Sequence, residues 1–308
     1  MVDLNNARVV IATTTYNMAS TLYRTYMSIL KQTYNNYYWL IIDNGSTDKT
    51  EQIVNKIQEE NKIEISYVKK EHGIRASAIN TAYDYAKGDY ICFVDADDEL
   101  TEKAIENFVK VYQEMAEPFR EQCWCVTANC IDDINGDVIG KKFPPNVNDL
   151  DELHVLMNNS YGEKLGMQNL KIVAKYRFPI FDDVDYVSET ILWLQLTEKY
   201  HNYYVNFDAR IYHHDNDNCY TRKAMTPIRA YSFYRSSVYI VNNIFVSARY
   251  KWIYNFKEII RINYYGRMSN IRLINRLKDI SRLKNQVLLF ATCPISVLYL
   301  VLKTLKTK

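Results

Sequence analysis

Four short apolar segments, separated by helix-like stretches, constrain the fold of this chain more than any other feature. The segments are rich in β-branched and aromatic residues, as buried strands are: "RVVIATTT" (8–15), "YWLIID" (38–43), "IEISYV" (63–68) and "DYICFV" (89–94). The stretches between them read as helices over residues 20–33, 48–60 and 74–86. The alternation predicts an α/β fold with a Rossmann-like, mostly parallel central sheet.

Polar residues follow each of the four predicted strands. The four stretches are "TTTYN" (13–17), "DNGSTD" (43–48), "KKEHGIR" (69–75) and "DADDE" (95–99). In an open α/β sheet the ligand binds beyond the carboxyl ends of the strands, so these residues should meet at one edge. They are the first candidates for a functional site.

The stretch "FVDADDEL" (93–100) places four carboxylates within five positions behind an apolar run. Such crowding favours protonation of one carboxyl group or a bound hard cation. A solvated acidic loop that caps a helix at Thr101 is the simpler alternative. A calcium-binding EF-hand does not fit, because Leu100 occupies the position where that loop needs glycine.

Asp43 and Tyr16 also suit a ligand. Asp43 ends an apolar strand, where its carboxylate can accept a hydrogen bond from a base or a ribose hydroxyl. Tyr16 offers a flat face to a planar ring, although ordinary packing explains it as well.

The second half of the chain is less regular. "CWCVTANCIDD" (123–133) reads as a strand, and "INGDVIG" (134–140) carries an Asn-Gly turn. An acidic loop and an amphipathic helix fill residues 176–196. We predict one domain over residues 1–221, with halves of about 1–120 and about 121–221, and a helical basic tail over 222–308.

The charge is divided between these parts. Residues 1–221 contain 21 Lys or Arg and 34 Asp or Glu, whereas residues 222–308 contain 17 Lys or Arg and only 2 Asp or Glu. Basic helices with interleaved Trp and Tyr suit an anionic membrane surface. A helical subdomain with a solvated basic face is the alternative, and the acidic body disfavours nucleic acid. The apolar run 287–302 has 16 residues, fewer than the roughly 20 that span a bilayer.

The expected location is the cytoplasm, or peripherally on the inner face of the cell membrane. The N-terminus "MVDLNNARVV" lacks the basic and apolar regions of a secretory signal. The six cysteines include no CxxC pair, so neither a zinc site nor a disulfide framework is expected.

Taken together, three motifs resemble the family 2 glycosyltransferases of bacterial capsule and lipopolysaccharide synthesis, which are inverting enzymes with a GT-A fold. The motifs are "VVIATTTYN" (9–17), "SILKQTYNNYYWLIIDNGSTDKT" (28–50) and "AKGDYICFVDADDEL" (86–100). Fold resemblance alone only suggests a function.

The resemblance implies that residues 1–221 are a catalytic domain, with a nucleotide-binding half of about 1–120 and an acceptor half of about 121–221. It also implies a role for each matched residue. Thr14 and Tyr16 would contact the uracil of a nucleotide-sugar donor, and Asp43 would hydrogen-bond the base. Asp97 would ligate Mn²⁺ or Mg²⁺, and Asp95 would contact the ribose or a metal-bound water. Asp98 is an alternative ligand.

An inverting enzyme also needs a general base for the acceptor hydroxyl. "YVSETILW" (186–193) resembles the version "Y-V-P-E-G-x-I-W" of the family, which points to Glu189. A helix cap formed with Ser188 is the structural alternative. The rival bases, close by in the chain, are Asp182, Asp183 and Asp185.

The chain departs from the family pattern in several places. The usual proline before "TYN" is replaced. In "HGIRASAIN" (72–80) the glycine and the asparagine are one residue further apart than in the family's "GxSxARN", and Arg75 is the residue of this stretch that would contact a phosphate. The motif QxxRW is missing, which argues against a processive synthase. The histidines of "YHHDND" (212–217) are either additional metal ligands or ordinary polar loop residues.

Two functions therefore follow from the sequence. The first is a metal-dependent glycosyltransferase of the hexosyl type that moves one sugar from a nucleotide sugar, a UDP-sugar on the family pattern, to a glycan or lipid-linked acceptor. The second is a non-catalytic nucleotide-sugar-binding scaffold of the same fold. A nucleotidyltransferase fits less well, because its glycine-rich phosphate loop is missing.

Overall fold

A single mixed sheet holds all four predicted strands, in the strand order β3-β2-β1-β4-β7-β6-β8-β5. The computed structural model describes residues 6–144, 162–215, 224–244 and 252–306, with side chains as far as Pro294. These residues form two compact units, 1–177 with 199–218 and 178–198 with 219–308, and each unit is described by itself. The predicted division of domains after residue 221 stays a prediction.

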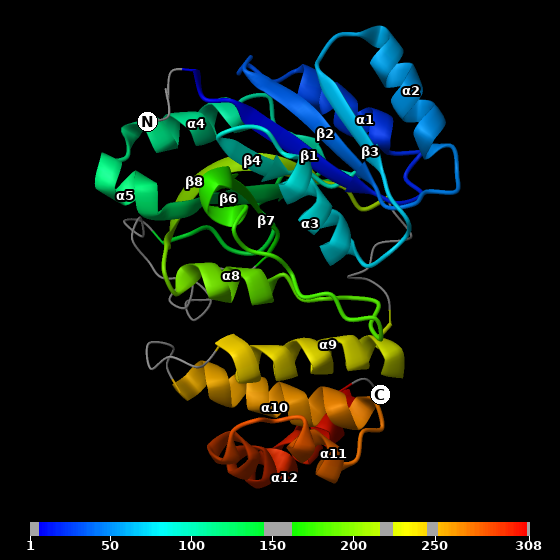
Figure 1. Ribbon diagram of the computed structural model, residues 1–308, viewed down its shortest axis with the longest axis vertical. Helices are drawn as coiled ribbons and strands as arrows, with labels where there is room; N and C mark the ends of the chain where they lie inside the picture. Colours follow the sequence, from blue (N-terminus) through cyan, green and yellow to red (C-terminus); the bar gives the residue numbers. More distant parts are fainter. Residues whose placement is uncertain (1–5, 145–161, 216–223, 245–251, 307–308) are drawn as a thin grey trace. The chain divides into compact units, whose positions relative to one another are not determined.

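The sheet belongs to the first unit (Figure 1). Its strands are β1 (Val9–Thr15), β2 (Tyr37–Asp43), β3 (Ile65–Lys69), β4 (Tyr90–Phe93), β5 (Glu99–Leu100), β6 (Cys123–Asp132), β7 (Lys164–Asn169) and β8 (His201–Tyr212). Its helices are α1 (Leu22–Leu30), α2 (Thr50–Glu60), α3 (Arg75–Tyr85), α4 (Ala104–Glu114), α5 (Glu117–Gln122) and α7 (Leu170–Val173).

Parallel pairing brings the carboxyl ends of the first strands to one edge. In the ladder between β1 and β2, Thr15 lies opposite Asp43. β4 pairs with the other side of β1, with Phe93 opposite Ala12. The predicted mostly parallel α/β fold is thereby confirmed, with antiparallel pairs where β7 joins β4 and β6 and where β5 joins β8.

Alternate residues of β1 and β2 cover the two faces of the sheet. Val9, Ile11 and Trp39 share one buried cluster with apolar side chains of α1, α2 and α4. Val10 and Leu40 are also fully buried, and because side chains alternate along a strand they point to the opposite face, where α3 contacts β1 and β2. Right-handed crossovers between parallel strands produce this distribution of helices over the two faces of the sheet.

The second half of the first unit is built on β6. The Asn-Gly turn after it is confirmed, since Gly136 has a φ of +72° and Ile131 forms an antiparallel bridge with Val138. Cys123, Cys125 and Cys130 of β6 are buried free thiols, as expected for cysteines that pack as small apolar residues. Cys219 lies outside the described residues.

The second unit is helical, as predicted for the tail. It contains α8 (Thr190–Thr197), α9 (Pro227–Tyr239), the π-helix η3 (Ile240–Ile244), α10 (Trp252–Met268), α11 (Leu273–Lys278) and α12 (Leu283–Lys306). Its core joins α9, α10 and α12 through side chains that include Tyr234, Ile259, Ile262 and Leu289. Among the described residues, none of the helices combines the length and apolarity needed to cross a bilayer.

The packing of α4 on the sheet leads to a first testable prediction. Phe108 of α4 is fully buried, and its ring meets the edge of Phe207 with 4.9 Å between centroids. Phe108→Ala should lower the free energy of unfolding by about 3–5 kcal/mol, because the cavity cannot close completely. Tyr85→Ala, at a side chain that is 53% exposed, is the control and should change it by no more than about 0.5 kcal/mol. Equal urea midpoints for the two variants would contradict this account.

Candidate active site

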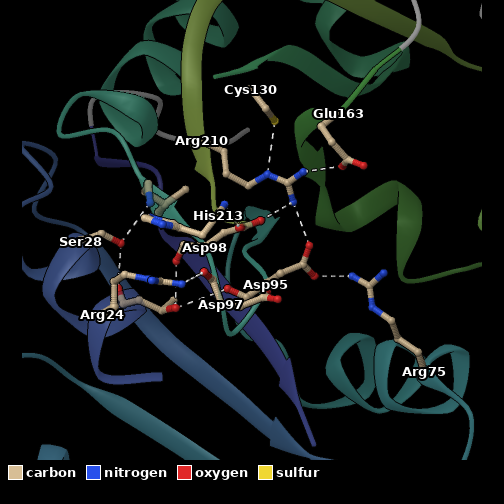
Figure 2. A network of polar contacts seen from close by, with 12 residues as sticks. Arg24, Ser28, Arg75, Asp95, Asp97, Asp98, Cys130, Glu163, Arg210 and His213 are labelled. Carbon is tan, nitrogen blue, oxygen red and sulfur yellow. Dashed lines mark hydrogen bonds and ion pairs between the residues drawn. The ribbon is translucent and has the colours of Figure 1, made fainter. Parts of the chain in front are cut away.

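The acidic loop after β4 is anchored by its apolar residues. Val94 and Ala96 are buried in the core of the first unit, and Asp95 and Asp97 alternate with them. The loop then enters β5, which pairs with β8 through Glu99 and Leu100. Figure 2 shows the aspartates at the centre of a network of arginines.

Asp95 is held by two guanidinium groups. Its Oδ1 accepts a hydrogen bond from Arg75 at 2.6 Å, and its Oδ2 accepts one from Arg210 at 2.8 Å. Burial opposes ionisation of Asp95, but the charges of Arg75 and Arg210 outweigh it and hold the pKa below its ordinary value. Asp95 is therefore an ionised carboxylate with both oxygens engaged.

Asp98 behaves in the opposite way. Its side chain is 1% exposed, and burial raises its pKa to about 8 in spite of the nearby Arg210. Its Oδ1 accepts a hydrogen bond from the main-chain N–H of His213 at 2.9 Å. Its Oδ2 lies 3.3 Å from Arg210 but has no partner with hydrogen-bond geometry among the described residues. One buried acceptor in this loop is thus left unsatisfied.

Asp97 is held through its main chain. Arg24 of α1 donates a hydrogen bond to the carbonyl oxygen of Asp97 and forms an ion pair with Asp215 at 2.6 Å. Thr25 of α1 donates to the carbonyl oxygen of Asp98 at 2.9 Å. Helix α1 therefore sets the backbone of the loop that presents the Asp97 carboxylate.

Arg210 is the residue that reading the sequence missed. It comes from β8, and its side chain is 5% exposed. Its guanidinium group forms ion pairs with Asp95 at 2.8 Å and with Glu163 at 2.7 Å. Its Nε donates to the thiol of Cys130 at 3.3 Å. No signal in the sequence pointed to it, because 115 positions separate it from Asp95.

Asp43 lies at the carboxyl end of β2 and is fully buried. Its Oδ1 accepts a hydrogen bond from the N–H of Ser46 at 2.7 Å, and its Oδ2 accepts one from the hydroxyl of Tyr67 at 2.7 Å. Burial and the bond to Asp43 raise the pKa of Tyr67. Each carboxylate oxygen keeps the capacity to accept a second hydrogen bond.

Tyr16 stands next to Asp43 in the fold, because β1 and β2 end side by side. Its ring is 40% exposed and lies against His72, with 4.1 Å between centroids. Thr14 is half-buried at the end of the same strand. His72 is a second aromatic surface that the sequence did not single out.

The position of His72 depends on Gly45. Gly45 has a φ of +82°, and a Cβ there would lie 2.7 Å from the main-chain nitrogen of His72. His72 also bonds through Nδ1 to the carbonyl oxygen of Asn44 at 3.0 Å. The "DNG" of the second motif therefore shapes the wall against which Tyr16 rests.

The two histidines after β8 lie beside carboxylates. His213 contacts Glu99 at 2.8 Å and Asp133 at 3.0 Å. His214 contacts Asp132 at 2.6 Å, and Asp132, Asp133 and His214 could together hold a metal ion. This donor set differs from the aspartates after β4, so a metal role for the histidines stays a prediction.

Glu189 belongs to the second unit, where it precedes the first residue of α8. No hydrogen bond from its side chain caps the helix. Of the rival bases, Asp183 accepts a hydrogen bond from Tyr231 at 2.7 Å and Asp185 accepts one from Ser232 at 2.6 Å. The structure thus brings Asp95, Asp97, Asp98 and Arg75 together in the first unit and places Glu189 in the other.

The aspartate loop fits a divalent cation. Carboxylate oxygens are the ligands that Mg²⁺ and Mn²⁺ prefer. The buried Oδ2 of Asp98 makes no hydrogen bond within the described residues and lies 3.3 Å from Arg210. Asp95 suits a cation less well, because two guanidinium groups already engage its oxygens.

Comparison with known proteins agrees with this geometry. A family model described as "Glycosyl transferase family 2" matches residues 10–127. The chain is 31% identical over 195 residues to "UDP-Glc:alpha-D-GlcNAc-diphosphoundecaprenol beta-1,3-glucosyltransferase WfaP" of Escherichia coli, a match that covers 60% of this chain and 68% of that protein. It is also 28% identical over 175 residues to an uncharacterized glycosyltransferase of Haemophilus influenzae, covering 56% and 66%. The chain belongs to glycosyltransferase family 2.

Solved structures show the same fold. S. aureus TarS (residues 1–349), in complex with UDP-GlcNAc, superposes with a TM-score of 0.57 at 15% identity, covering 92% of this chain and 78% of that one. The mannosyltransferase PcManGT from Pyrobaculum calidifontis, in complex with GDP-Man and Mn²⁺, gives a TM-score of 0.51 at 17% identity, covering 100% and 83%. At these identities the likeness establishes the GT-A fold.

The burial of Arg210 among carboxylates leads to the second prediction. Arg210→Met leaves Asp95, Asp98 and Glu163 without their shared cation, so the free energy of unfolding should fall by about 3–5 kcal/mol. Arg210→Lys should recover only part of this loss, because one ammonium cannot replace a planar fork of donors.

Arg8→Met is the matched control. Arg8 pairs with Glu64 at 2.6 Å, but the two side chains are 44% and 65% exposed, so the loss should stay below about 1 kcal/mol. Urea unfolding measures all three variants. If Arg210→Met unfolds at the same urea concentration as Arg8→Met, Arg210 does not hold this loop together.

Proposed function

We propose that this chain transfers one sugar, with inversion, from a nucleotide sugar to a hydroxyl group of a glycan or lipid-linked glycan acceptor in the synthesis of a cell-surface glycan. The observation that carries the proposal is the aspartate loop, with its unsatisfied Asp98 oxygen, on the sheet edge that also holds Asp43 and Tyr16. The printed name of WfaP, which specifies UDP-Glc and a diphosphoundecaprenol-linked GlcNAc, supports a UDP-sugar donor and a lipid-linked acceptor.

The first unit would bind the donor. The exposed ring of Tyr16, backed by His72, gives the base a surface to stack on, and Thr14 lies at the end of the same strand. Asp43 would accept a hydrogen bond from the base. Arg75 begins α3 with its side chain about half exposed, so its guanidinium group can reach a phosphate while it stays close to Asp95.

A divalent cation, Mn²⁺ or Mg²⁺, would be held by Asp97, with Asp98 as the further ligand. Such a cation neutralises the charge on a diphosphate leaving group as a Lewis acid. Asp95, fixed by Arg75 and Arg210, would instead accept a hydrogen bond from the ribose or from a bound water.

Glu189 would act as the general base. In the proposed step the acceptor oxygen attacks the anomeric carbon, the bond from that carbon to the diphosphate breaks, and the acceptor proton passes to the Glu189 carboxylate. Attack from the side opposite the leaving group inverts the configuration. Asp183 and Asp185 serve to anchor α9, which favours a structural role for them.

The third prediction tests the donor site. The purified chain should release nucleoside diphosphate from one member of a panel of UDP-sugars and GDP-mannose, and EDTA should abolish the release until Mn²⁺ or Mg²⁺ is added back. Asp97→Asn should lose metal-dependent binding of UDP, because an amide is a poor ligand for a hard cation. Asp137→Asn, at an exposed aspartate of the same unit, is the control. UDP binding of equal strength without metal and in Asp97→Asn would reject this assignment.

The fourth prediction tests the base. Glu189→Gln keeps the shape of the side chain but cannot take a proton, so kcat should fall by roughly 10²-fold or more while the Kd for the donor stays nearly unchanged. Glu198→Gln, at the other end of α8, is the control. Near-normal turnover in Glu189→Gln would assign the role to Asp182, Asp183 or Asp185. Donor binding without turnover in the unaltered chain would identify a scaffold.

A further inference from the structure

One face of α12 is apolar and exposed. Asn285, Leu289 and Thr292 are buried, and the opposite face of the helix carries Leu283 at 75%, Val287 at 62% and Phe290 at 63% exposure. Each exposed residue precedes a buried one by two positions, which is about half a turn at 3.6 residues per turn. The exposed side chains therefore form a continuous stripe opposite the packed face.

The packed face is held by specific contacts with α10. Asn263 of α10 donates hydrogen bonds to the carbonyl oxygen of Leu289 at 2.7 Å and to the hydroxyl of Thr292 at 3.1 Å. Asn255 donates to the side chain of Asn285 at 2.9 Å. Within the second unit α10 lies between α9 and α12 (Figure 1). Helix α12 is thus fixed along its side, with the apolar stripe directed outward.

The C-terminal part of the chain, which holds this helix, is basic in composition. Residues 222–308 contain 17 Lys or Arg and two acidic residues, Glu258 and Asp279. Glu258 is buried and pairs with Arg261 at 2.5 Å, and Asp279 accepts a hydrogen bond from Tyr234. Glu258 is thus enclosed in the unit, whereas Asp279 is exposed after α11 and adds one negative charge beside Lys278.

Exposed cations lie on or next to the same two helices. Lys284 lies on α12 itself. Lys278 is the last residue of α11, which contacts α12, and Arg272 directly precedes α11. Ile274 of α11 is also 57% exposed. Apolar side chains with cations around them match the boundary between the headgroups and the acyl chains of an anionic bilayer.

We propose that this face of α11 and α12 docks onto an anionic membrane surface, with Leu283, Val287 and Phe290 inserted below the headgroups and the cations at their level. A second copy of the chain is a poorer occupant, because a two-fold contact would bring the same cations together. Nucleic acid would leave the three apolar side chains unused.

The test uses the full chain and two kinds of vesicle, one of pure phosphatidylcholine and one of phosphatidylcholine and phosphatidylglycerol in equal parts. The chain should sediment with the anionic vesicles only, and high salt should release at least part of it. The triple variant Leu283→Gln, Val287→Gln, Phe290→Gln should bind these vesicles about tenfold or more weakly, because it loses the inserted apolar area. Lys278→Glu with Lys284→Glu should weaken binding as well.

Ile134→Gln is the matched control, at a side chain of the first unit that is 79% exposed, and it should bind like the unaltered chain. Circular dichroism and the urea midpoint should stay unchanged in the triple variant, since its three positions are exposed. Equal binding to neutral vesicles, or an equal loss in Ile134→Gln, would overturn the proposal. So would a dimer of the unaltered chain, seen by light scattering, that the triple variant converts to a monomer. No donor sugar is present, so the result does not depend on the proposed transfer.

Discussion

The guanidinium group of Arg210 is the interaction on which the candidate site depends. Asp95 and Asp98 of the loop after β4 and Glu163 from a distant segment all lie around it. Carboxylates gathered this closely would repel one another, and a buried cation offsets that repulsion only where its geometry is good. The planar fork of arginine meets this condition because it can serve several acceptors at once.

Helix α1 supplies the second constraint, through its polar face. Thr25 donates to the main chain of the aspartate loop, Ser28 accepts a hydrogen bond from the N–H of Leu100 at 3.0 Å, and Gln32 donates to the carbonyl oxygen of Thr101 at 2.8 Å. A spacing of three residues puts Thr25 and Ser28 on one side of α1, and Gln32 follows just after the helix ends. The stretch "SILKQT" thus has a physical reason to accompany the acidic loop: it satisfies main-chain groups that would otherwise be buried without partners.

The elements of the first unit could be predicted because their signals are local. The ends of β1 and β2 differ from the expected ones by no more than one residue, since apolar runs and turn residues bound them. Arg210 could not be predicted, because only the pairing of β8 with β5 and β6 brings it to Asp95. His72 was missed for a similar reason, since its contact with Tyr16 follows from the close approach at Gly45. The sequence therefore predicted that the carboxyl edge of the sheet is polar, but not which side chains contact one another there.

The three aspartates of the loop are not equivalent, and their environments separate them. Asp95 is ionised because two guanidinium groups compensate for its burial, whereas Asp98 is disfavoured as an anion because burial outweighs one shared arginine. Asp97 is only half-buried, on a backbone that Arg24 holds. A cation that arrives at this loop would make ionisation of Asp98 favourable, because a positive charge beside a buried carboxyl group lowers its pKa. Asp97 and Asp98 therefore stay the proposed cation ligands, while Asp95 keeps the loop attached to the rest of the sheet through Arg75 and Arg210.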